Sequence, residues 1–312
     1  MAPPIFGPAT SIPSLAGKVI LITGGTSGLG RETVLSFASH GAQHIYFTGR
    51  SQSSADKLLS EVKQKFPSAT VSFLQLDLAS LESVKAGAAE FLRKEERLDI
   101  LILNAGIMAV PPALTKDGYE VQFGTNHLGH AALTKLLLPT LSRTASSKPG
   151  TDVRIVSLTS LGYKFASTIH FDKLKTPQED IAFMLRPWAR YGQSKLANLL
   201  YVKSLAKRYP NITSVVVHPG VSATGLVDGL SWGNKAFVYA TTVGQLMPPA
   251  KVAWNQQWAA TAELGEGKGR VQSGVFYEPV GLVGGLTAAA KDEELEARLW
   301  EWTEEELGKA GI

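Results

Sequence analysis

Short runs of hydrophobic residues alternate along the chain with longer stretches of helical periodicity. A short continuous apolar run is typical of a strand buried on both faces, and the longer stretches are typical of helices that cover a sheet. The runs predict strands at 18–23, 44–48, 71–76, 98–103, 154–158, 212–217 and 274–278. The stretches between them predict helices at 53–66, 80–95, 127–141 and 190–207.

This alternation favours an α/β fold, with a doubly wound parallel sheet of about seven strands and helices on both faces. Residues 1–312 are then a single domain, with residues 1–15 as an N-terminal extension. Periodicity is weakest at 225–270. Because ligands of open α/β sheets bind beyond the carboxyl ends of the strands, we predict that this segment covers the substrate, with plain packing as the alternative. Its three tryptophans are Trp232, Trp254 and Trp258.

The composition is that of a globular protein and excludes several kinds of site. Hydrophobic residues make up 44% of the chain and charged residues 19%. The net charge of +4 is spread over mixed charges without a Lys/Arg tract, which argues against nucleic acid as a partner. The absence of cysteine excludes disulfides, thiolate metal ligands and a cysteine nucleophile. Without a secretory leader or a long apolar run, we expect a cytoplasmic protein with no membrane anchor.

The glycine-rich sequence TGGTSGLG, residues 23–30, directly follows the first predicted strand and precedes a helix. Gly24, Gly28 and Gly30 permit a tight turn and a close approach of the backbone to a ligand. Free N–H groups at the start of the next helix suit a pyrophosphate. This position predicts a dinucleotide site, and a P-loop is excluded because no Gly-Lys-Ser/Thr follows.

The end of the second predicted strand indicates which dinucleotide binds. Sites for NAD place an acidic residue there, which accepts hydrogen bonds from the ribose. This chain has Arg50 instead, and a guanidinium can bind a 2′-phosphate through two hydrogen bonds. We therefore predict NADP(H), with Ser27, Arg31 and Ser51 as further donors; a loop cation is the alternative for Arg50. Asp77 either accepts from the adenine amino group or caps the helix that follows.

The sequence WARYGQSKLANLL, residues 188–200, has Tyr191 and Lys195 one turn apart on one face of a predicted helix. A cation close to a phenol favours the phenolate and lowers its pKa from about 10. Tyr191 would then donate and accept a proton near neutral pH. On this pair alone, a surface lysine that packs over a surface tyrosine is the simpler interpretation.

Seven motifs together resemble those of the short-chain dehydrogenase/reductase family. In chain order they are TGGTSGLG at 23–30, LDL at 76–78, LNAG at 103–106, TNHLGH at 125–130, VSLTS at 156–160, YGQSK at 191–195 and HPGVSAT at 218–224. The resemblance covers roughly residues 16–280 and implies a Rossmann-type fold. NHLGH, SKLANLL and VHPG are similar to the retinol-dehydrogenase and WW-oxidoreductase branch of the family.

The resemblance implies a role for each matching residue. Tyr191 would be the general acid/base, and Lys195 would bind the nicotinamide ribose and lower the pKa of Tyr191. Ser160 would hydrogen-bond the substrate oxygen, with Thr159 as the alternative, and Asn126 would hold a water in a proton relay. The residues implied in cofactor binding are Gly24, Thr26, Ser27, Gly28, Leu29, Gly30, Arg50, Ser51, Asp77, Leu78, Asn104, Ala105, Gly106, Tyr191, Lys195, Pro219, Gly220, Val221 and Thr224.

These roles imply an NADPH-dependent oxidoreductase that interconverts a ketone or aldehyde and an alcohol. A lipophilic or aromatic small molecule is the expected substrate, with secondary metabolites among the candidates. A retinal/retinol-type dehydrogenase is one alternative. A non-catalytic module that senses NADP(H) is another, although the complete Ser-Tyr-Lys set argues against it. Acyl transfer by Ser160 would need a histidine base and an acid in triad arrangement, and the sequence offers no such set, which argues against a hydrolase.

Two further patterns favour structural roles. His127 and His130 lie three residues apart on a predicted helix but lack a nearby third ligand, so we predict no metal. Small and apolar residues form a stripe along the helix at 190–207, which predicts packing against the sheet or, as the alternative, a homodimer interface. The stripe consists of Ala197, Leu200, Tyr201, Ser204 and Leu205.

Overall fold

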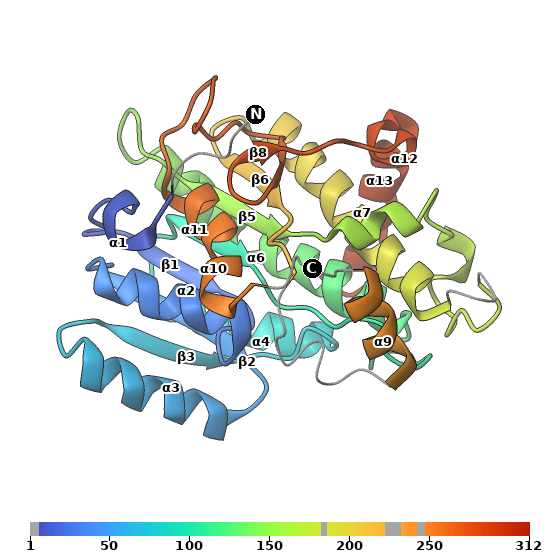
Figure 1. Cartoon of the computed structure of the whole chain (residues 1–312), viewed down its shortest axis with the longest axis horizontal. Helices are drawn as coiled ribbons and strands as arrows, with labels where there is room; N and C mark the ends of the chain where they lie inside the picture. Colours follow the sequence, from blue (N-terminus) through green and yellow to red (C-terminus); the bar gives the residue numbers. More distant parts are fainter. Residues whose placement is uncertain (1–5, 182–185, 222–231, 242–246) are drawn as a thin grey trace.

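A computed structural model of the chain describes residues 6–181, 186–221, 232–241 and 247–312. Its centre is an eight-stranded sheet with the strand order β3-β2-β1-β4-β5-β6-β7-β8 (Figure 1). Strands β1 to β7 run parallel, and β8 pairs antiparallel with β7 at one edge. The doubly wound parallel sheet is therefore confirmed, with β8 as an addition.

All seven predicted strands are present, and their ends differ from the prediction by two residues at most. They are β1 (Val19–Ile22), β2 (His44–Gly49), β3 (Val71–Gln75), β4 (Ile100–Leu103), β5 (Arg154–Leu158), β6 (Thr213–Val217) and β7 (Phe276–Glu278), followed by β8 (Leu282–Val283). The sheet grows in one direction from β1 to β3 and in the other from β4 onwards. Open α/β sheets bind ligands at such a switch point, here between β1 and β4.

Helices cover both faces of the sheet, and none of those described is long and apolar enough to cross a bilayer. The α-helices are α1 (Pro8–Ser11), α2 (Gly28–Ser39), α3 (Gln52–Lys65), α4 (Leu81–Lys94), α5 (Val121–Phe123), α6 (Gly129–Ala145), α7 (Arg186–Arg208), α9 (Trp232–Thr241), α10 (Pro249–Val252), α11 (Trp254–Thr261), α12 (Ala288–Lys291) and α13 (Glu293–Lys309). The shorter helices are η1 (Gly124–Leu128), which is a π-helix, and the 3₁₀-helices η2 (Leu161–Phe165) and η3 (Phe171–Lys173). The helix predicted at 127–141 thus begins with a π-helical segment.

Two hydrophobic cores lie on opposite faces of the sheet. Successive residues of a strand point to opposite faces. Leu21 of β1 accordingly packs in the core with α4, α6 and α7, whereas its neighbours Ile20 and Ile22 pack in the core with α2, α3 and α11. Because both faces are buried, the strands read as continuous apolar runs.

The apolar stripe of α7 is buried within the chain, largely beneath α13. The ring of Tyr201 stacks on Trp300 with 5.3 Å between the ring centroids. The Oγ of Ser204 donates to Glu296 at 3.1 Å, and the ammonium groups of Lys203 and Lys207 pair with the same carboxylate. The stripe thus packs within the chain, as predicted, but the partner of Tyr201 and Ser204 is α13 rather than the sheet. A homodimer stays a prediction.

The two segments singled out at the sequence level both pack on the domain. Within residues 1–15, Phe6, Ile12 and Leu15 are buried in the core on the α2 side. Of the segment 225–270, residues 225–231 and 242–246 lie outside the described part. Among its tryptophans, Trp258 is buried and Trp254 half-buried against the same core, so both have the packing role. Trp232 is 86% exposed.

Candidate active site

The glycine-rich turn joins β1 to α2 at the carboxyl edge of the sheet. Gly24 and Gly28 have φ angles of 67° and 55°, a region that side chains rarely adopt. A Cβ on Gly30 would lie 2.3 Å from the carbonyl oxygen of Gly24, so α2 can start this close to the turn only with glycine. Gly25, which the sequence reasoning passed over, has a similar constraint, because its Cβ would lie 2.5 Å from that of Phe47.

Asn104, at the end of β4, holds the turn from the neighbouring strand. Its Nδ2 donates to the carbonyl oxygens of Thr23 at 2.8 Å and of Gly24 at 3.4 Å. Ala105 packs against the turn, and its N–H donates to the Oγ1 of Thr23 at 3.0 Å. The hydroxyl of Ser27, just before α2, makes no capping bond to the helix. The turn, the first N–H groups of α2 and this hydroxyl together fit a pyrophosphate.

The end of β2 carries an exposed cation. Among the described residues, the guanidinium of Arg50 has no carboxylate partner. Ser51 caps α3 by accepting from the N–H of Ser54 at 3.3 Å. Arg31 was expected to donate to the cofactor as well, but its guanidinium pairs with Glu32 and Glu61. A cofactor phosphate would have to compete with these two carboxylates for the guanidinium of Arg31.

Three other predicted cofactor residues have packing contacts. Thr26 lies against the end of β2, where a Cβ on Gly49 would be 2.8 Å from its methyl group. Leu29 packs on the α2-side core, and Leu78 is buried on the other side of the sheet. The Oδ1 of Asp77 accepts from the N–H of Ala79 at 3.0 Å. The capping alternative for Asp77 is wrong, because Ser80 caps α4.

Tyr191 and Lys195 lie on α7 next to the carboxyl end of β5. The Nζ of Lys195 is 5.8 Å from the centroid of the Tyr191 ring. It donates to the carbonyl oxygen of Leu158 at 3.1 Å, which fixes it at the strand end. Both residues are about 95% buried, with exposed fractions of 5% and 4%, so the surface interpretation of the pair is wrong.

Burial dominates the protonation of both groups. It raises the pKa of Tyr191 to about 12, and a hydrogen bond with Ser160 acts in the opposite direction. It lowers the pKa of Lys195 to about 8. The predicted lowering of the pKa of Tyr191 is therefore wrong for this structure, because burial disfavours the phenolate. Tyr191 carries its proton at pH 7.

Ser160, rather than Thr159, faces Tyr191. The Oγ1 of Thr159 donates to the carbonyl oxygen of Lys195 at 2.7 Å and supports the backbone of α7. The Oγ of Ser160 accepts from the N–H of Gly162 at 3.1 Å and is a hydrogen-bonding partner of Tyr191. A Cβ on Gly162 would lie 2.9 Å from the Tyr191 ring, so this glycine lets the ring approach the serine.

Asn126 lies in the π-helix η1, a rare geometry that is frequent at functional sites. Its Oδ1 accepts from the N–H of Ile107 at 2.8 Å, and its Nδ2 donates to the Oγ of Ser194 at 2.9 Å. A Cβ on Gly106 would lie 3.1 Å from the Oδ1 of Asn126 and 3.4 Å from the Nζ of Lys195. The four predicted catalytic residues thus gather at one edge of the sheet, beside the glycine-rich turn.

Comparisons with known proteins agree with this arrangement. The model of the short chain dehydrogenase family matches residues 18–169. A short-chain dehydrogenase/reductase of Aspergillus calidoustus, drtF, is 39% identical over 96% of this chain and 96% of its own length. The chain belongs to the short-chain dehydrogenase/reductase family. It is an oxidoreductase that acts on CH–OH groups.

Two further relatives refine this assignment. Human retinol dehydrogenase 13 is 34% identical over 94% of this chain and 86% of its own length. This similarity supports the retinol-dehydrogenase-like branch. The crystal structure of an uncharacterised protein from Mycobacterium paratuberculosis superimposes with a TM-score of 0.72, at 30% identity and with 97% of each chain covered. The similarity to these two proteins extends over nearly the whole chain.

One histidine of this dehydrogenase connects the glycine-rich turn to the catalytic residues. The Nδ1 of His130 lies 2.9 Å from the carbonyl oxygen of Asn126, and its Nε2 lies 2.8 Å from the Oγ1 of Thr23. A carbonyl oxygen only accepts, so Nδ1 carries the hydrogen and Thr23 donates to Nε2. Burial lowers the pKa of His130 to about 4, which keeps the ring neutral. Its position one turn after Asn126 brings the ring close to that carbonyl oxygen, and the sequence had indicated only a structural role for His130.

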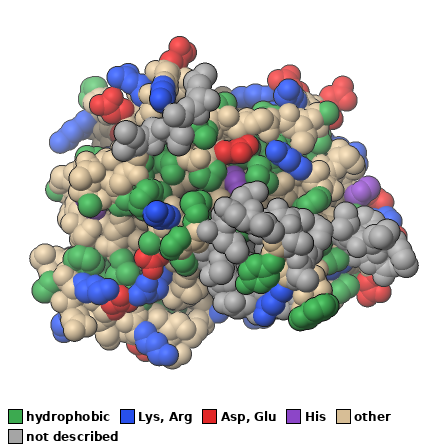
Figure 2. All heavy atoms as spheres, viewed as in Figure 1, with side chains coloured by type: hydrophobic (Ala, Val, Ile, Leu, Met, Phe, Trp, Pro, Cys, Tyr) green, Lys and Arg blue, Asp and Glu red, His purple; other side chains and the backbone are tan. Residues whose placement is uncertain are grey.

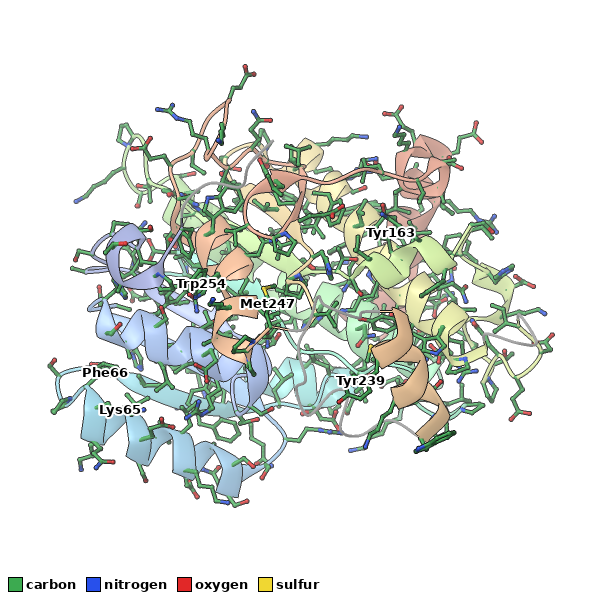
Figure 3. The ribbon with its side chains drawn as sticks, in the orientation of Figure 1. Lys65, Phe66, Tyr163, Tyr239, Met247 and Trp254 are labelled. Atoms are coloured by element: carbon green, nitrogen blue, oxygen red, sulfur yellow. The ribbon has the colours of Figure 1, made fainter. Side chains whose placement is uncertain are left out.

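His127 and the segment after β6 complete the account of the predicted residues. The Nε2 of His127 lies 3.0 Å from the Oγ1 of Thr303 in α13, which gives this histidine a structural role. Because β6 is the parallel neighbour of β5, Pro219, Gly220 and Val221 follow it at the same edge of the sheet as Ser160. The carbonyl oxygen of Val221 accepts from the N–H of Met247 at 3.1 Å. Met247 directly precedes α10 and is labelled in Figure 3. Thr224 lies outside the described residues.

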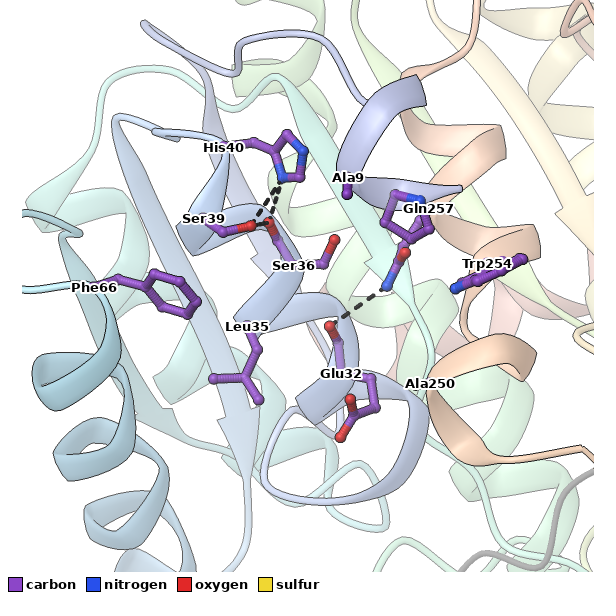
Figure 4. A pocket seen from close by; sticks show the side chains of 11 residues that line it. Ala9, Glu32, Leu35, Ser36, Ser39, His40, Phe66, Ala250, Trp254 and Gln257 are labelled. Atoms are coloured by element: carbon purple, nitrogen blue, oxygen red, sulfur yellow. Dashed lines mark hydrogen bonds between the residues drawn. The ribbon is translucent and has the colours of Figure 1, made fainter. Parts of the chain in front are cut away.

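A separate hollow of about 300 Å³ lies between α1, α2 and α11 (Figure 4). Its walls include Leu35, Phe66 and Trp254, and the Nε2 of Gln257 donates across it to the carbonyl oxygen of Glu32 at 3.4 Å. None of the predicted site residues lines this hollow, so it is distinct from the catalytic group of the dehydrogenase.

Proposed function

We propose that this short-chain dehydrogenase/reductase is an NADPH-dependent carbonyl reductase. It converts a lipophilic or aromatic ketone or aldehyde to the alcohol and catalyses the reverse reaction. The observation that carries the proposal is the buried, protonated Tyr191 with Ser160 as its hydrogen-bonding partner and Lys195 one helical turn away. A phenol that keeps its proton at pH 7 is a donor, as carbonyl reduction requires.

Two hydroxyl groups act on the substrate oxygen in this mechanism. NADPH, when bound, supplies the hydride. Negative charge develops on the carbonyl oxygen, and Ser160 and Tyr191 stabilise it with hydrogen bonds from a buried site. Tyr191 then gives its proton to this oxygen. Lys195, whose pKa of about 8 leaves it mostly charged at pH 7, stabilises the phenolate that remains.

The cofactor preference rests on the end of β2. Arg50 is exposed there, no acidic side chain is present in the sequence FTGRS, and Ser51 offers a hydroxyl at the start of α3. A 2′-phosphate would find a cation at this point, whereas the ribose hydroxyls of NAD would lack a carboxylate acceptor. The glycine-rich turn and Asn104 would hold the pyrophosphate and adenosine side.

The first test is turnover by Tyr191→Phe, followed as oxidation of NADPH with aromatic, quinone, retinal and polyketide-like carbonyls. Loss of the proton donor lowers kcat by about 10² to 10⁴ and leaves the fold intact. Tyr201→Phe is the matched control, because Tyr201 is a buried tyrosine of the same helix that stacks on Trp300. Full turnover by Tyr191→Phe would contradict the proposal. Tight NADPH binding without turnover on any carbonyl would favour an NADP(H) sensor.

A charge reversal tests the cofactor preference separately. Arg50→Asp is expected to raise the KM for NADPH by about tenfold or more and to spare NADH, because it removes a charge-assisted phosphate contact. Arg93→Asp, at an exposed position of α4, controls for net charge. An unchanged ratio of the two KM values in Arg50→Asp would overturn the phosphate contact.

A further inference from the structure

A small apolar cluster surrounds Tyr191, apart from the two cores of the sheet. It consists of Ala109, Trp188 and Tyr191, with Met108 packed against it. The rings of Trp188 and Tyr191 meet edge to face, with centroids 6.3 Å apart and an angle of 88°. A proton donor within an apolar cluster favours a carbonyl compound whose remaining surface is apolar.

Phe165 extends this cluster towards the surface. It lies in η2, five residues after Ser160, and its ring meets that of Trp188 edge to face with centroids 6.3 Å apart. The exposed fraction falls from 44% at Phe165 to 6% at Trp188 and 5% at Tyr191. Three aromatic rings therefore form a continuous row from solvent to the predicted proton donor.

Asn234 of α9 fixes the position of Trp188. Its Oδ1 accepts from the indole N–H of Trp188 at 3.0 Å, and its Nδ2 lies 3.4 Å from the carbonyl oxygen of Ala109. An indole only donates and a carbonyl only accepts, so the two partners determine the orientation of the amide. Asn234 thereby links α9 to two members of the cluster.

Two large side chains of α9 reach the surface. Trp232 is 86% exposed and Tyr239 42% exposed, and hydrophobic side chains reach the surface over this helix (Figure 2). The hydrogen bond between Asn234 and Trp188 connects α9 to the catalytic helix α7. The backbone of Ala109 is itself held in a left-handed conformation, with φ 50°, and its N–H donates to Gln122 at 2.8 Å.

We propose that Phe165 and Trp188 form an aromatic wall that selects planar, conjugated carbonyl substrates, and that Asn234 positions Trp188 in this wall. The inference rests on the proposed reduction of a carbonyl by Tyr191. A flat π-system can stack on one aromatic ring of this wall or meet it edge to face, and it gains contact that a puckered ring of the same size does not. The wall therefore discriminates by shape and π-contact, and the hydroxyls of Ser160 and Tyr191 recognise only the oxygen.

The test compares two aldehydes with the same carbon skeleton, 2-naphthaldehyde and its saturated counterpart decahydronaphthalene-2-carbaldehyde. Trp188→Leu is expected to lower kcat/KM for 2-naphthaldehyde by about tenfold, mainly through a higher KM. A tenfold loss corresponds to the free energy of one aromatic pair. The saturated aldehyde is expected to change by about twofold or less. Trp254→Leu, which removes a tryptophan from an aromatic pair with Phe6, is the matched control.

The positioning role of Asn234 is tested by a double-mutant cycle. Trp188→Phe keeps a ring but loses the indole N–H, and Asn234→Leu removes the acceptor. Each substitution is expected to raise the KM for 2-naphthaldehyde about threefold without changing kcat. A threefold change corresponds to the loss of one hydrogen bond. The KM of the double variant is expected to be no higher than that of either single variant. Additive effects would show that Asn234 does not act through Trp188.

Two measurements separate failure of the wall from failure of the proposed function. Turnover of both aldehydes with equal losses in Trp188→Leu would overturn the wall and leave carbonyl reduction standing. If the wild type reduces neither aldehyde, the binding of 2-naphthalenemethanol to the NADPH-bound protein is measured by calorimetry, and its result decides whether the aromatic wall exists. Binding that weakens about tenfold in Trp188→Leu would support the wall and contradict the reductase proposal, and no binding would overturn both.

Discussion

The glycine-rich turn and the surroundings of Tyr191 are built on different principles. At the turn, Gly30 packs against the carbonyl oxygen of Gly24, and Asn104 donates to this oxygen and to that of Thr23. Around Tyr191, the contacts join side chains, such as the indole of Trp188 and the amide of Asn234. The turn depends mainly on backbone atoms and on the lack of side-chain volume at its glycines, whereas the surroundings of Tyr191 depend on the identity of side chains.

This difference determines what each region responds to. Backbone groups do not titrate near neutral pH, so the turn should be insensitive to pH and very sensitive to added volume. Side chains can be exchanged or can change protonation, so the catalytic region should respond to pH and to conservative substitutions. The predictions below test this contrast, from the largest expected effect to the smallest.

The largest effect is expected from Gly30→Ala. Its Cβ would lie 2.3 Å from the carbonyl oxygen of Gly24 and 2.7 Å from the Nδ2 of Asn104, so the turn must deform. We expect NADPH affinity to fall about 100-fold, with about 1–3 kcal/mol of lost stability, measured by calorimetry and urea unfolding. Gly308→Ala in α13, where a Cβ would meet nothing within 4 Å, is the control. Equal affinities for both variants would remove the steric argument.

The second effect is a loss of carbonyl reduction at high pH. Burial lowers the pKa of Lys195 to about 8, so its ammonium is charged below this pH and is lost above it. Tyr191, with a pKa of about 12, keeps its proton throughout this range. We expect kcat/KM to fall by up to tenfold per pH unit above about pH 8, measured between about pH 6 and 10.

The glycine-rich turn supplies the contrast in the same pH series. Adenosine 2′,5′-bisphosphate is the part of NADP that would reach the turn side and Arg50 without reaching Lys195. Its Kd is expected to stay constant from about pH 8 to 10, since guanidinium and backbone groups do not titrate there. A parallel fall in its affinity would show that the turn, too, depends on a titrating side chain.

The smallest effect is expected from Glu306→Gln in α13. Burial alone would raise the pKa of Glu306, but its carboxylate pairs with Lys175 and Lys309 and accepts from the hydroxyl of Tyr119, and these contacts together lower its pKa to about 2. A lowered carboxyl pKa contributes stability above the ordinary value of 4.5, and this is lost as pH falls towards about 2. We expect Glu306→Gln to lose about 1–2 kcal/mol at neutral pH.

Urea unfolding at neutral pH and near pH 3 measures this effect, and the difference from wild type should shrink at the lower pH. Glu305→Gln is the control, because Glu305 is 66% exposed and pairs with Lys309 at the surface, where ion pairs contribute at most about 1 kcal/mol. A pH-independent loss in Glu306→Gln would mean that packing, rather than charge, is what Glu306 provides.

Much of the fold could be predicted because buried parallel strands have an unmistakable local pattern. The runs such as VILI in β1 and ILIL in β4 are apolar on both faces since helices cover both. The strand β8 was missed because Leu282–Val283 is too short to form a pattern. The π-helix at Asn126 was missed because it differs from an α-helix only in hydrogen bonding, which residue types do not encode.

The candidate site was predictable where its geometry is local. The glycine-rich turn and the pair Tyr191 and Lys195 lie within single segments, so spacing alone brings their members together. The pKa direction of Tyr191 was predicted wrongly because its burial comes from elements distant in sequence. The contact of Trp188 with Asn234, 46 residues later, likewise has no local pattern that could have indicated it.

Helix α13 has a consequence for the synthesis of the protein. It supplies Trp300 and Glu296 to the outer face of α7, yet 84 residues separate Arg208, the last residue of α7, from Glu293. At about 5–20 residues per second, a ribosome needs roughly 4 to 17 s to make this stretch. For that time the nascent chain carries its complete Tyr-Lys pair on a helix that lacks the α13 contacts of Tyr201 and Ser204. Chaperones that recognise exposed apolar helices therefore have a defined interval in which to bind this chain.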